Sequence, residues 1–162
     1  MAVDMFLKID GIPGESTDAR HSDEIDLLSY NWGESQPPTA SSASGSSAAG
    51  RVTMRDFHFA MHVNKASPKL FLACASGAHI RNAILTVRRT GANPVEFLKW
   101  TLSDVTVASY QTARDMPAAE PPLDQTSLRF TKIEVEYSAV KPDGSLDAPI
   151  KAGWDLQANR LV

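Results

Sequence analysis

The chain has 162 residues, of which 43% are hydrophobic and 22% charged, so its length and composition suit one globular domain over residues 1–162. Its formal net charge of -3, without a basic cluster, argues against nucleic-acid partners and against insertion into or binding to an anionic membrane. A single cysteine, Cys74, excludes an intramolecular disulfide framework, so the fold depends on its apolar core.

The first ten residues, MAVDMFLKID, alternate apolar and polar side chains, which is typical of a half-buried β-strand. They include Asp4 and Asp10 and no long apolar run, so we do not interpret them as a signal peptide, and we expect the protein to fold in the cytoplasm. A second strand is predicted at 24–33, EIDLLSYNWG. Its apolar side chains on both sides indicate that two different surfaces cover it.

Two segments have the composition of flexible loops. Residues 34–50 combine Pro37 and Pro38 with a run of serine, alanine and glycine that cannot anchor in a core. Residues 112–124 form a second proline-rich segment. Loops of this length are usually functional or disordered, so both are expected to be flexible.

Further strand patterns occupy most of the remaining chain, at 51–63, 80–89, 95–102, 104–111, 126–137 and near the C-terminus. Within 126–137 the apolar phase changes, which indicates either a β-bulge near Thr131 or Lys132 or a strand shared by two sheets. The pattern predicts an all-β barrel or sandwich.

One short helix is predicted at 68–76. Ser67 is a suitable N-cap, Pro68 fits the first helical position, and Gly77 suits the left-handed residue that ends a helix. Helical spacing then places Leu70 and Cys74 on one packed stripe. We therefore expect this helix to lie against the β-structure as its only helical attachment.

Cys74 and His79 could in principle form a nucleophile and base. A reactive thiolate prefers an electropositive site, whereas Cys74 lies near the C-terminal end of the predicted helix, where the helix dipole disfavours negative charge. His79 lies beyond Gly77 and is predicted to point elsewhere. We therefore favour a packed, mostly buried Cys74, with His79 out of bonding reach of its sulfur.

Asp56, His58 and His62 share one face of the strand predicted at 51–63 and are a second candidate site. His58 and His62 would be about 13 Å apart along an extended strand, which is too far for one metal ion. A polar surface is the simpler interpretation, and no cofactor or metal is predicted. A small β-barrel hydrolase or ligand-binding protein, using either candidate site, stays as the alternative.

Six segments resemble, in order, the haemolysin-coregulated proteins (Hcp) of bacterial type VI secretion. They are FLKIDGIPGES at 6–16, EIDLLSYNWG at 24–33, SPKLFLACASGAHI with AILTVRR at 67–89, FLKWTLSDVTVAS at 97–109, LRFTKIEVEY at 128–137 and GWDLQAN at 153–159. The resemblance implies a mainly β fold, in which two sheets form a closed or nearly closed barrel with the helix at 68–76 on its flank.

The resemblance also implies a function, that of a structural tube subunit and not an enzyme. Hexameric rings would stack into a tube that a contractile apparatus expels, and the lumen would carry or chaperone effector proteins. The implied partners are further copies of the chain, the sheath, spike and baseplate proteins, and secreted effectors. The protein would leave the bacterial cytoplasm for the extracellular space or a target cell, without a signal peptide.

The resemblance suggests roles for individual residues. The segment matching 24–33 helps to line the lumen, so alternation predicts that Ser29 and Asn31 face the lumen while Trp32 packs in the core. The segment matching 34–50 is an extended arm that touches neighbouring subunits or rings. Its predicted contact residues are Pro37, Pro38, Ser42 and Ser46.

Overall fold

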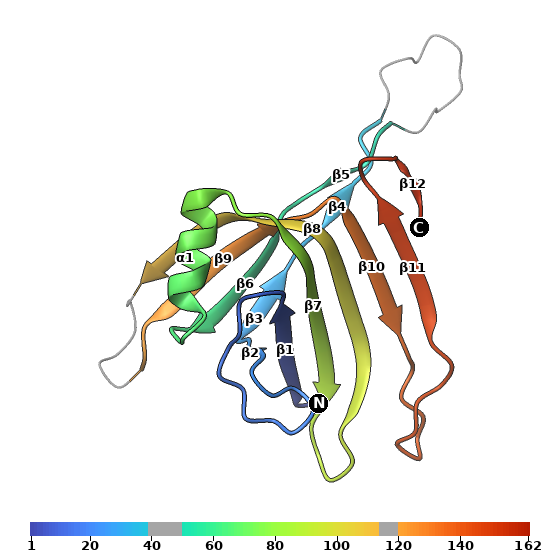
Figure 1. Cartoon of the computed structure of the whole chain (residues 1–162). Helices are drawn as coiled ribbons and strands as arrows, with labels where there is room; N and C mark the ends of the chain where they lie inside the picture. Colours follow the sequence, from blue (N-terminus) through green and yellow to red (C-terminus); the bar gives the residue numbers. More distant parts are fainter. Residues whose placement is uncertain (39–49, 114–119) are drawn as a thin grey trace, which may run out of the picture.

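The computed structural model describes residues 1–38, 50–113 and 120–162, and this part of the chain contains twelve strands and one helix (Figure 1). The helix, α1, is neither long nor apolar enough to cross a membrane. The elements are β1 (Val3–Ile9), β2 (Ile25–Asp26), β3 (Ser29–Asn31), β4 (Glu34–Ser35), β5 (Thr53–Met54), β6 (Phe57–His62), α1 (Ser67–Ser76), β7 (Ile80–Arg89), β8 (Val95–Ala113), β9 (Leu123–Arg129), β10 (Lys132–Tyr137), β11 (Ile150–Asp155) and β12 (Arg160–Leu161).

Ten of the twelve strands form two layers that share β8, and β4 and β5 pair with each other in a separate ribbon. The larger sheet has the antiparallel order β12-β11-β10-β8-β7-β1-β2, and the smaller sheet continues from the second half of β8 through β9 and β6 to β3. The segments predicted as separate strands at 95–102 and 104–111 are therefore one strand. It turns at Asp104, whose φ of 52° lies in the left-handed region, and Thr131 Oγ1 donates a 3.0 Å hydrogen bond to its carboxylate.

The phase change predicted within 126–137 marks the passage between the layers. The chain leaves β9 in the smaller sheet at Arg129 and enters β10 in the larger sheet at Lys132. Of the two explanations open from the sequence, a segment that contributes to two sheets is confirmed. The mainly β composition with one helix is confirmed as well.

Of the expected closed or nearly closed barrel, the closed form is wrong, because in the described part of the chain hydrogen bonds do not close the two sheets. Only β8 runs continuously through both layers. Near Leu27 and Leu28 the chain passes from one sheet to the other. The Leu27 N–H donates a hydrogen bond to the carbonyl oxygen of Met5 in the larger sheet, and the Leu28 N–H donates one to the carbonyl oxygen of Ala60 in the smaller sheet. The segment 24–33, predicted as one strand, is thus divided into β2 and β3, because the chain changes sheets between them.

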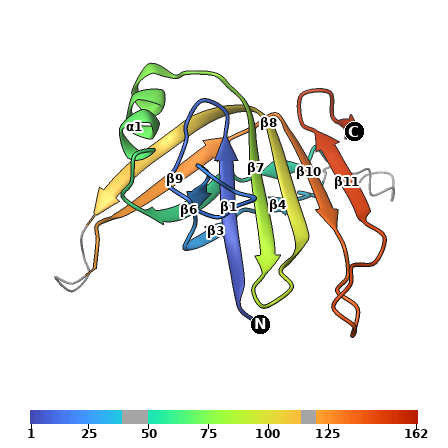
Figure 2. The ribbon, with the colours of Figure 1, turned by 60° about the horizontal axis from the view of Figure 1, so that its bottom comes forward.

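The core lies between the layers, with β1, β7 and β8 on one side and β3, β6 and β9 on the other (Figure 2). Helix α1 packs beside β8 through the buried side chains Leu70 and Ala73. It ends as predicted at Gly77, whose φ is 65°, but its N-cap is Ala66. Ser67 already belongs to the helix, and its hydroxyl donates to the carboxylate of Asp124 at 2.5 Å instead of capping the backbone.

Candidate functional site

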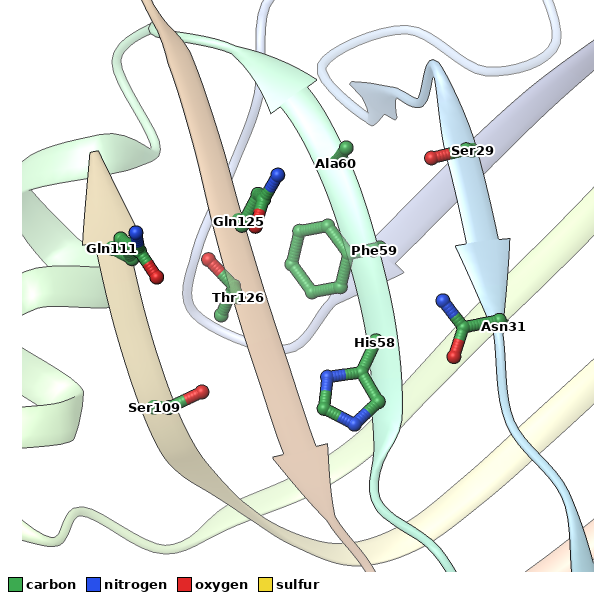
Figure 3. A pocket seen from close by; sticks show the side chains of 9 residues that line it. All are labelled: Ser29, Asn31, His58, Phe59, Ala60, Ser109, Gln111, Gln125 and Thr126. Atoms are coloured by element: carbon green, nitrogen blue, oxygen red, sulfur yellow. The ribbon is translucent and has the colours of Figure 1, made fainter. Parts of the chain in front are cut away.

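A polar surface covers the outer face of the smaller sheet (Figure 3). Register pairs align its side chains in two rows that cross the strands. The first row contains Asn31, His58, Ser127 and Ser109, and the second contains Ser29, Ala60, Gln125 and Gln111. We call these eight residues the polar face; all of them except the buried Ser127 line a hollow of about 440 Å³.

Strand alternation explains why these side chains point outward. Tyr30 stacks on the buried Phe57 with ring centroids 5.6 Å apart, and Trp32 meets Trp100 edge-to-face at 5.1 Å. Because successive side chains of a strand point to opposite faces, Ser29 and Asn31 are exposed on the other side. Trp32 is half-buried and packs against the core.

The polar face has hydrogen-bonding capacity but little charge. Apart from the imidazole of His58, its side chains are hydroxyl, amide and methyl groups that do not ionise near neutral pH. Ser109 and Ser127 share a hydrogen bond across β8 and β9. An ion pair lies beyond the first row, where Arg129 Nε is 3.6 Å from Asp56 Oδ1.

Leu70, Cys74 and His79 fall in three different environments. Leu70 is fully buried, while Cys74 is only half-buried and contacts the core. His79 is exposed, and its Nε2 lies 3.1 Å from Asp104 Oδ1. In the described part of the chain no hydrogen bond joins Cys74 to His79, and the imidazole is paired with the carboxylate of Asp104 instead.

The second candidate site is also dispersed. Asp56 pairs with Arg129, His58 belongs to the polar face, and the half-buried His62 lies farther along β6. Among the described residues, no three side chains of the histidine, cysteine and carboxylate types lie close enough together to hold a metal ion.

The predicted contact arm begins at a small ribbon formed by β4 and β5. Pro37 and Pro38 follow β4 and are exposed. Ser42 and Ser46 lie outside the described residues. The ribbon shares a hollow with Gly153, Trp154 and Asn159, so the base of the arm lies against β11 and the turn that follows it.

Sequence reasoning missed a buried polar anchor beneath α1. Asp124 is fully buried, and one carboxylate oxygen accepts hydrogen bonds from Ser67 Oγ at 2.5 Å and Tyr110 OH at 3.0 Å. Burial, followed by the hydrogen bond to Asp124, raises the pKa of Tyr110. Asp124 falls in the segment predicted as a loop, so only the tertiary structure shows that it is enclosed.

A second missed cluster lies on the outer side of β1. Arg88 Nη2 lies 2.9 Å from Asp4 Oδ2 and 2.7 Å from Asp18 Oδ2. The hydrogen bond from Arg88 is the main reason that the pKa of Asp18 falls to about 2. Because its members are 84 and 70 residues apart in sequence, no local pattern predicts this cluster.

Gln111 and Gln125 of the polar face were also missed. Gln111 directly precedes and Gln125 directly follows the segment predicted as the loop 112–124, and pairing of β8 with β9 brings them to the same row. Period-2 alternation could have identified their outward direction, but the pairing of the strands could not be derived from it.

Comparison with known proteins agrees with this architecture. Residues 6–137 match the family described as "Type VI secretion system effector, Hcp". The chain is 40% identical over 162 residues to "Protein hcp1" of Pseudomonas aeruginosa strain PAO1, with 98% of each chain covered. It is also similar to the crystal structure of Hcp1 from Salmonella typhimurium, with a TM-score of 0.82, 39% identity and full coverage of both chains. A structure described as a type six secretion system protein has a TM-score of 0.93, with 25% identity and coverage of 99% of this chain and 100% of that one. The chain therefore belongs to the Hcp family of type VI secretion proteins.

Proposed function

We propose that this chain is the structural subunit of a type VI secretion tube, in which hexameric rings stack and the polar face lines the lumen. The single observation that carries the lumen assignment is the polar face itself: a hollowed sheet surface of polar, mostly uncharged side chains, whose opposite side faces the apolar core. Family membership supports self-assembly, export and partners in the secretion machinery.

A lining of this kind suits a carrier that must release its cargo. Hydroxyl and amide groups can exchange hydrogen bonds with water and with many protein surfaces at small net cost. Fixed charges would instead select cargo of one sign and repel the other. We propose that effector proteins are held in the lumen by such contacts, with Ser29 and Asn31 among the contact residues.

The role is structural and not catalytic. Among the described residues no hydrogen bond joins Cys74 to His79, and no cluster formed with Asp56, His58 and His62 could hold a metal ion, so neither candidate site has the arrangement that its chemistry needs. In this function the single unit 1–162 meets the sheath, spike and baseplate proteins from outside the ring, and the arm with Pro37, Pro38, Ser42 and Ser46 contacts neighbouring subunits.

The test is to place a tryptophan at position 31. Asn31→Trp would fill part of the hollow, and Lys8→Trp is the matched control, because Lys8 is exposed on β1 in the larger sheet. Tagged rings are co-expressed with small effectors of the host's secretion system, and the co-purified effector is quantified. We expect both variants to assemble at six times the 17.6 kDa subunit mass, with effector retention reduced only by Asn31→Trp. Unchanged retention, or loss of folding in Asn31→Trp alone, would contradict the assignment.

A further inference from the structure

The chain has four histidines, and the two that lie outside β6 are already engaged with acidic side chains. His21 is buried, and its ring nitrogens lie 2.8 Å from Glu24 Oε2 and 2.9 Å from Glu96 Oε1. His79 is exposed, and its Nε2 lies 3.1 Å from Asp104 Oδ1. Both imidazoles therefore have carboxylate partners within the same subunit.

The other two histidines lie on the outward side of β6. Phe59 and Met61 of this strand are buried, so His58 and His62 share the opposite side. His62 is half-buried and lies outside the polar face, and its register partner on β9 is Leu123. Of the two, only His58 is exposed and lines the hollow.

The neighbours of His58 are polar but carry no charge. Asn31 pairs with it across β3, and Ser127 pairs with it across β9. Figure 3 shows the imidazole on the same side of the sheet as Asn31 and Ser109. Ser109 and Ser127 share a hydrogen bond with each other. Within the described residues, no hydrogen bond or ion pair ties the imidazole of His58 to an acidic side chain.

The charged groups near His58 do not give the polar face a net charge. Asp56 Oδ1 lies 3.6 Å from Arg129 Nε, so these two charges offset each other. The side chains that β3, β8 and β9 contribute to the polar face are hydroxyl and amide groups, which do not ionise near neutral pH. His62, one row beyond the polar face, is the other titratable group on this side of β6. Because histidine is the side chain whose charge changes between about pH 5 and pH 8, protonation of His58 changes the charge of the polar face.

Resting on the proposed function, we propose that His58 makes the selection of cargo in the lumen depend on pH. With a neutral imidazole the polar face is uncharged and discriminates little between acidic and basic cargo. With an imidazolium each copy adds one positive charge, and the copies of a ring add their charges at one level of the channel. Acidic pH therefore strengthens the retention of acidic cargo and weakens the retention of basic cargo.

The two forms of the imidazole differ in the groups that they bind. A neutral imidazole has one donor and one acceptor nitrogen, so it exchanges hydrogen bonds with hydroxyl and amide groups. An imidazolium has two N–H donors and binds carboxylates through charge-assisted hydrogen bonds, which are roughly twice as strong as neutral ones. The hollow of about 440 Å³ that His58 lines gives a carboxylate side chain access to the ring.

The size of the effect follows from the exposure of His58. A single exposed ion pair changes a binding equilibrium by about twofold. A cargo segment with several carboxylates meets imidazolium groups from neighbouring copies of the ring. Three or four such contacts multiply to a change of about tenfold in affinity.

The experiment measures the binding of two short peptides to purified wild-type rings at about pH 8 and about pH 5.5. One peptide alternates glutamate with serine and the other alternates lysine with serine. Both carry a rhodamine label, and both keep their charge over this range. Fluorescence anisotropy gives the Kd at low salt, where screening is weak, and light scattering verifies that the rings persist at both pH values. We expect the glutamate peptide to bind about tenfold more tightly at pH 5.5 than at pH 8, and the lysine peptide to bind more weakly at pH 5.5.

Two substitutions at position 58 locate the effect. His58→Gln keeps a polar side chain that does not ionise, so the Kd of the glutamate peptide should change less than about twofold between the two pH values. His58→Arg carries a permanent charge, so this peptide should bind tightly at both. The matched control is His79→Gln, which removes an exposed imidazole outside the polar face and should behave like the wild type. His62→Gln should also keep most of the pH dependence.

Two results would overturn the assignment of His58. One is a pH dependence in His58→Gln rings that is as large as in wild-type rings. The other is a wild-type affinity for the glutamate peptide that is the same at both pH values, or no binding of this peptide at pH 5.5.

The variant Asn31→Trp separates this inference from the proposed function. If Asn31→Trp lowers effector retention while His58→Gln keeps the full pH dependence, the inference is overturned and the tube function stands. If wild-type rings do not form, or if Asn31→Trp leaves effector retention unchanged, the proposed function fails and the inference fails with it.

Discussion

Replacing Asp124 with alanine tests how α1 is held against the β-structure. Asp124 is fully buried and accepts hydrogen bonds from Ser67, in the first turn of α1, and from Tyr110 of β8. A hydrogen bond to a charged acceptor contributes about 1.5–3 kcal/mol, so two such bonds total about 3–6 kcal/mol. Removing the buried carboxylate also removes its desolvation cost. We therefore expect a net loss of about 2–4 kcal/mol in the free energy of unfolding.

Urea denaturation followed by circular dichroism measures this loss. Protein concentration is held constant, because assembly adds to apparent stability. The single variants Ser67→Ala and Tyr110→Phe should each cost about 1–2 kcal/mol. When either variant is combined with Asp124→Ala, the double variant should lose less free energy of unfolding than the sum of its two single variants, because both hydroxyls donate to the same carboxylate. A loss below about 1 kcal/mol for Asp124→Ala would refute the proposed role of Asp124 in holding α1. Stability effects of the single variants that add within about 0.5 kcal/mol in the double variants would refute it as well.

Three further outcomes follow from other parts of the molecule. Gly14→Ala should destabilise the fold by at least about 1–3 kcal/mol in the same denaturation assay, because a Cβ there would lie 2.4 Å from the carbonyl oxygen of Glu24; full stability would contradict the close approach. Asp18 has a folded-state pKa of about 2, below its ordinary value of 3.8, so its stabilising effect is complete above pH 4 and disappears as the pH falls toward 2. Asp18→Asn should lower stability at pH 6 and flatten this acid limb of the stability curve, whereas an unchanged limb would show that another group causes it. Effector retention should change less than about threefold between 0.05 and 0.5 M salt, since the polar face carries little charge to screen; a tenfold loss would indicate ionic contacts.

The local features of α1 could be predicted from its sequence. Pro68 and Gly77 are signals that act within a few residues, and the helix begins and ends within one residue of the expected bounds. Ser67 shows the limit of that reasoning. It has the side chain of a good N-cap, but a buried carboxylate 57 residues away provides a stronger acceptor for its hydroxyl.

Strand alternation predicted the face toward which each side chain points better than it predicted which strands pair. It correctly separated Tyr30 and Trp32 from Ser29 and Asn31, because direction depends only on position along the strand. It did not show that the chain changes sheets after Leu27, nor that β8 turns at Asp104 and belongs to both layers. Those features arise from contacts between distant segments, which also bring Gln111 and Gln125 into one row with Ser29.

The central claim, that the polar face lines the lumen of a ring, is tested most directly by electron cryomicroscopy of the assembled wild-type particle. The account predicts a closed ring of six subunits with a central channel, and β3, β6, β9 and the second half of β8 form the channel wall with Ser29 and Asn31 turned inward. A particle without a channel, or a channel wall formed by the outer side of β1 and β7, would contradict it.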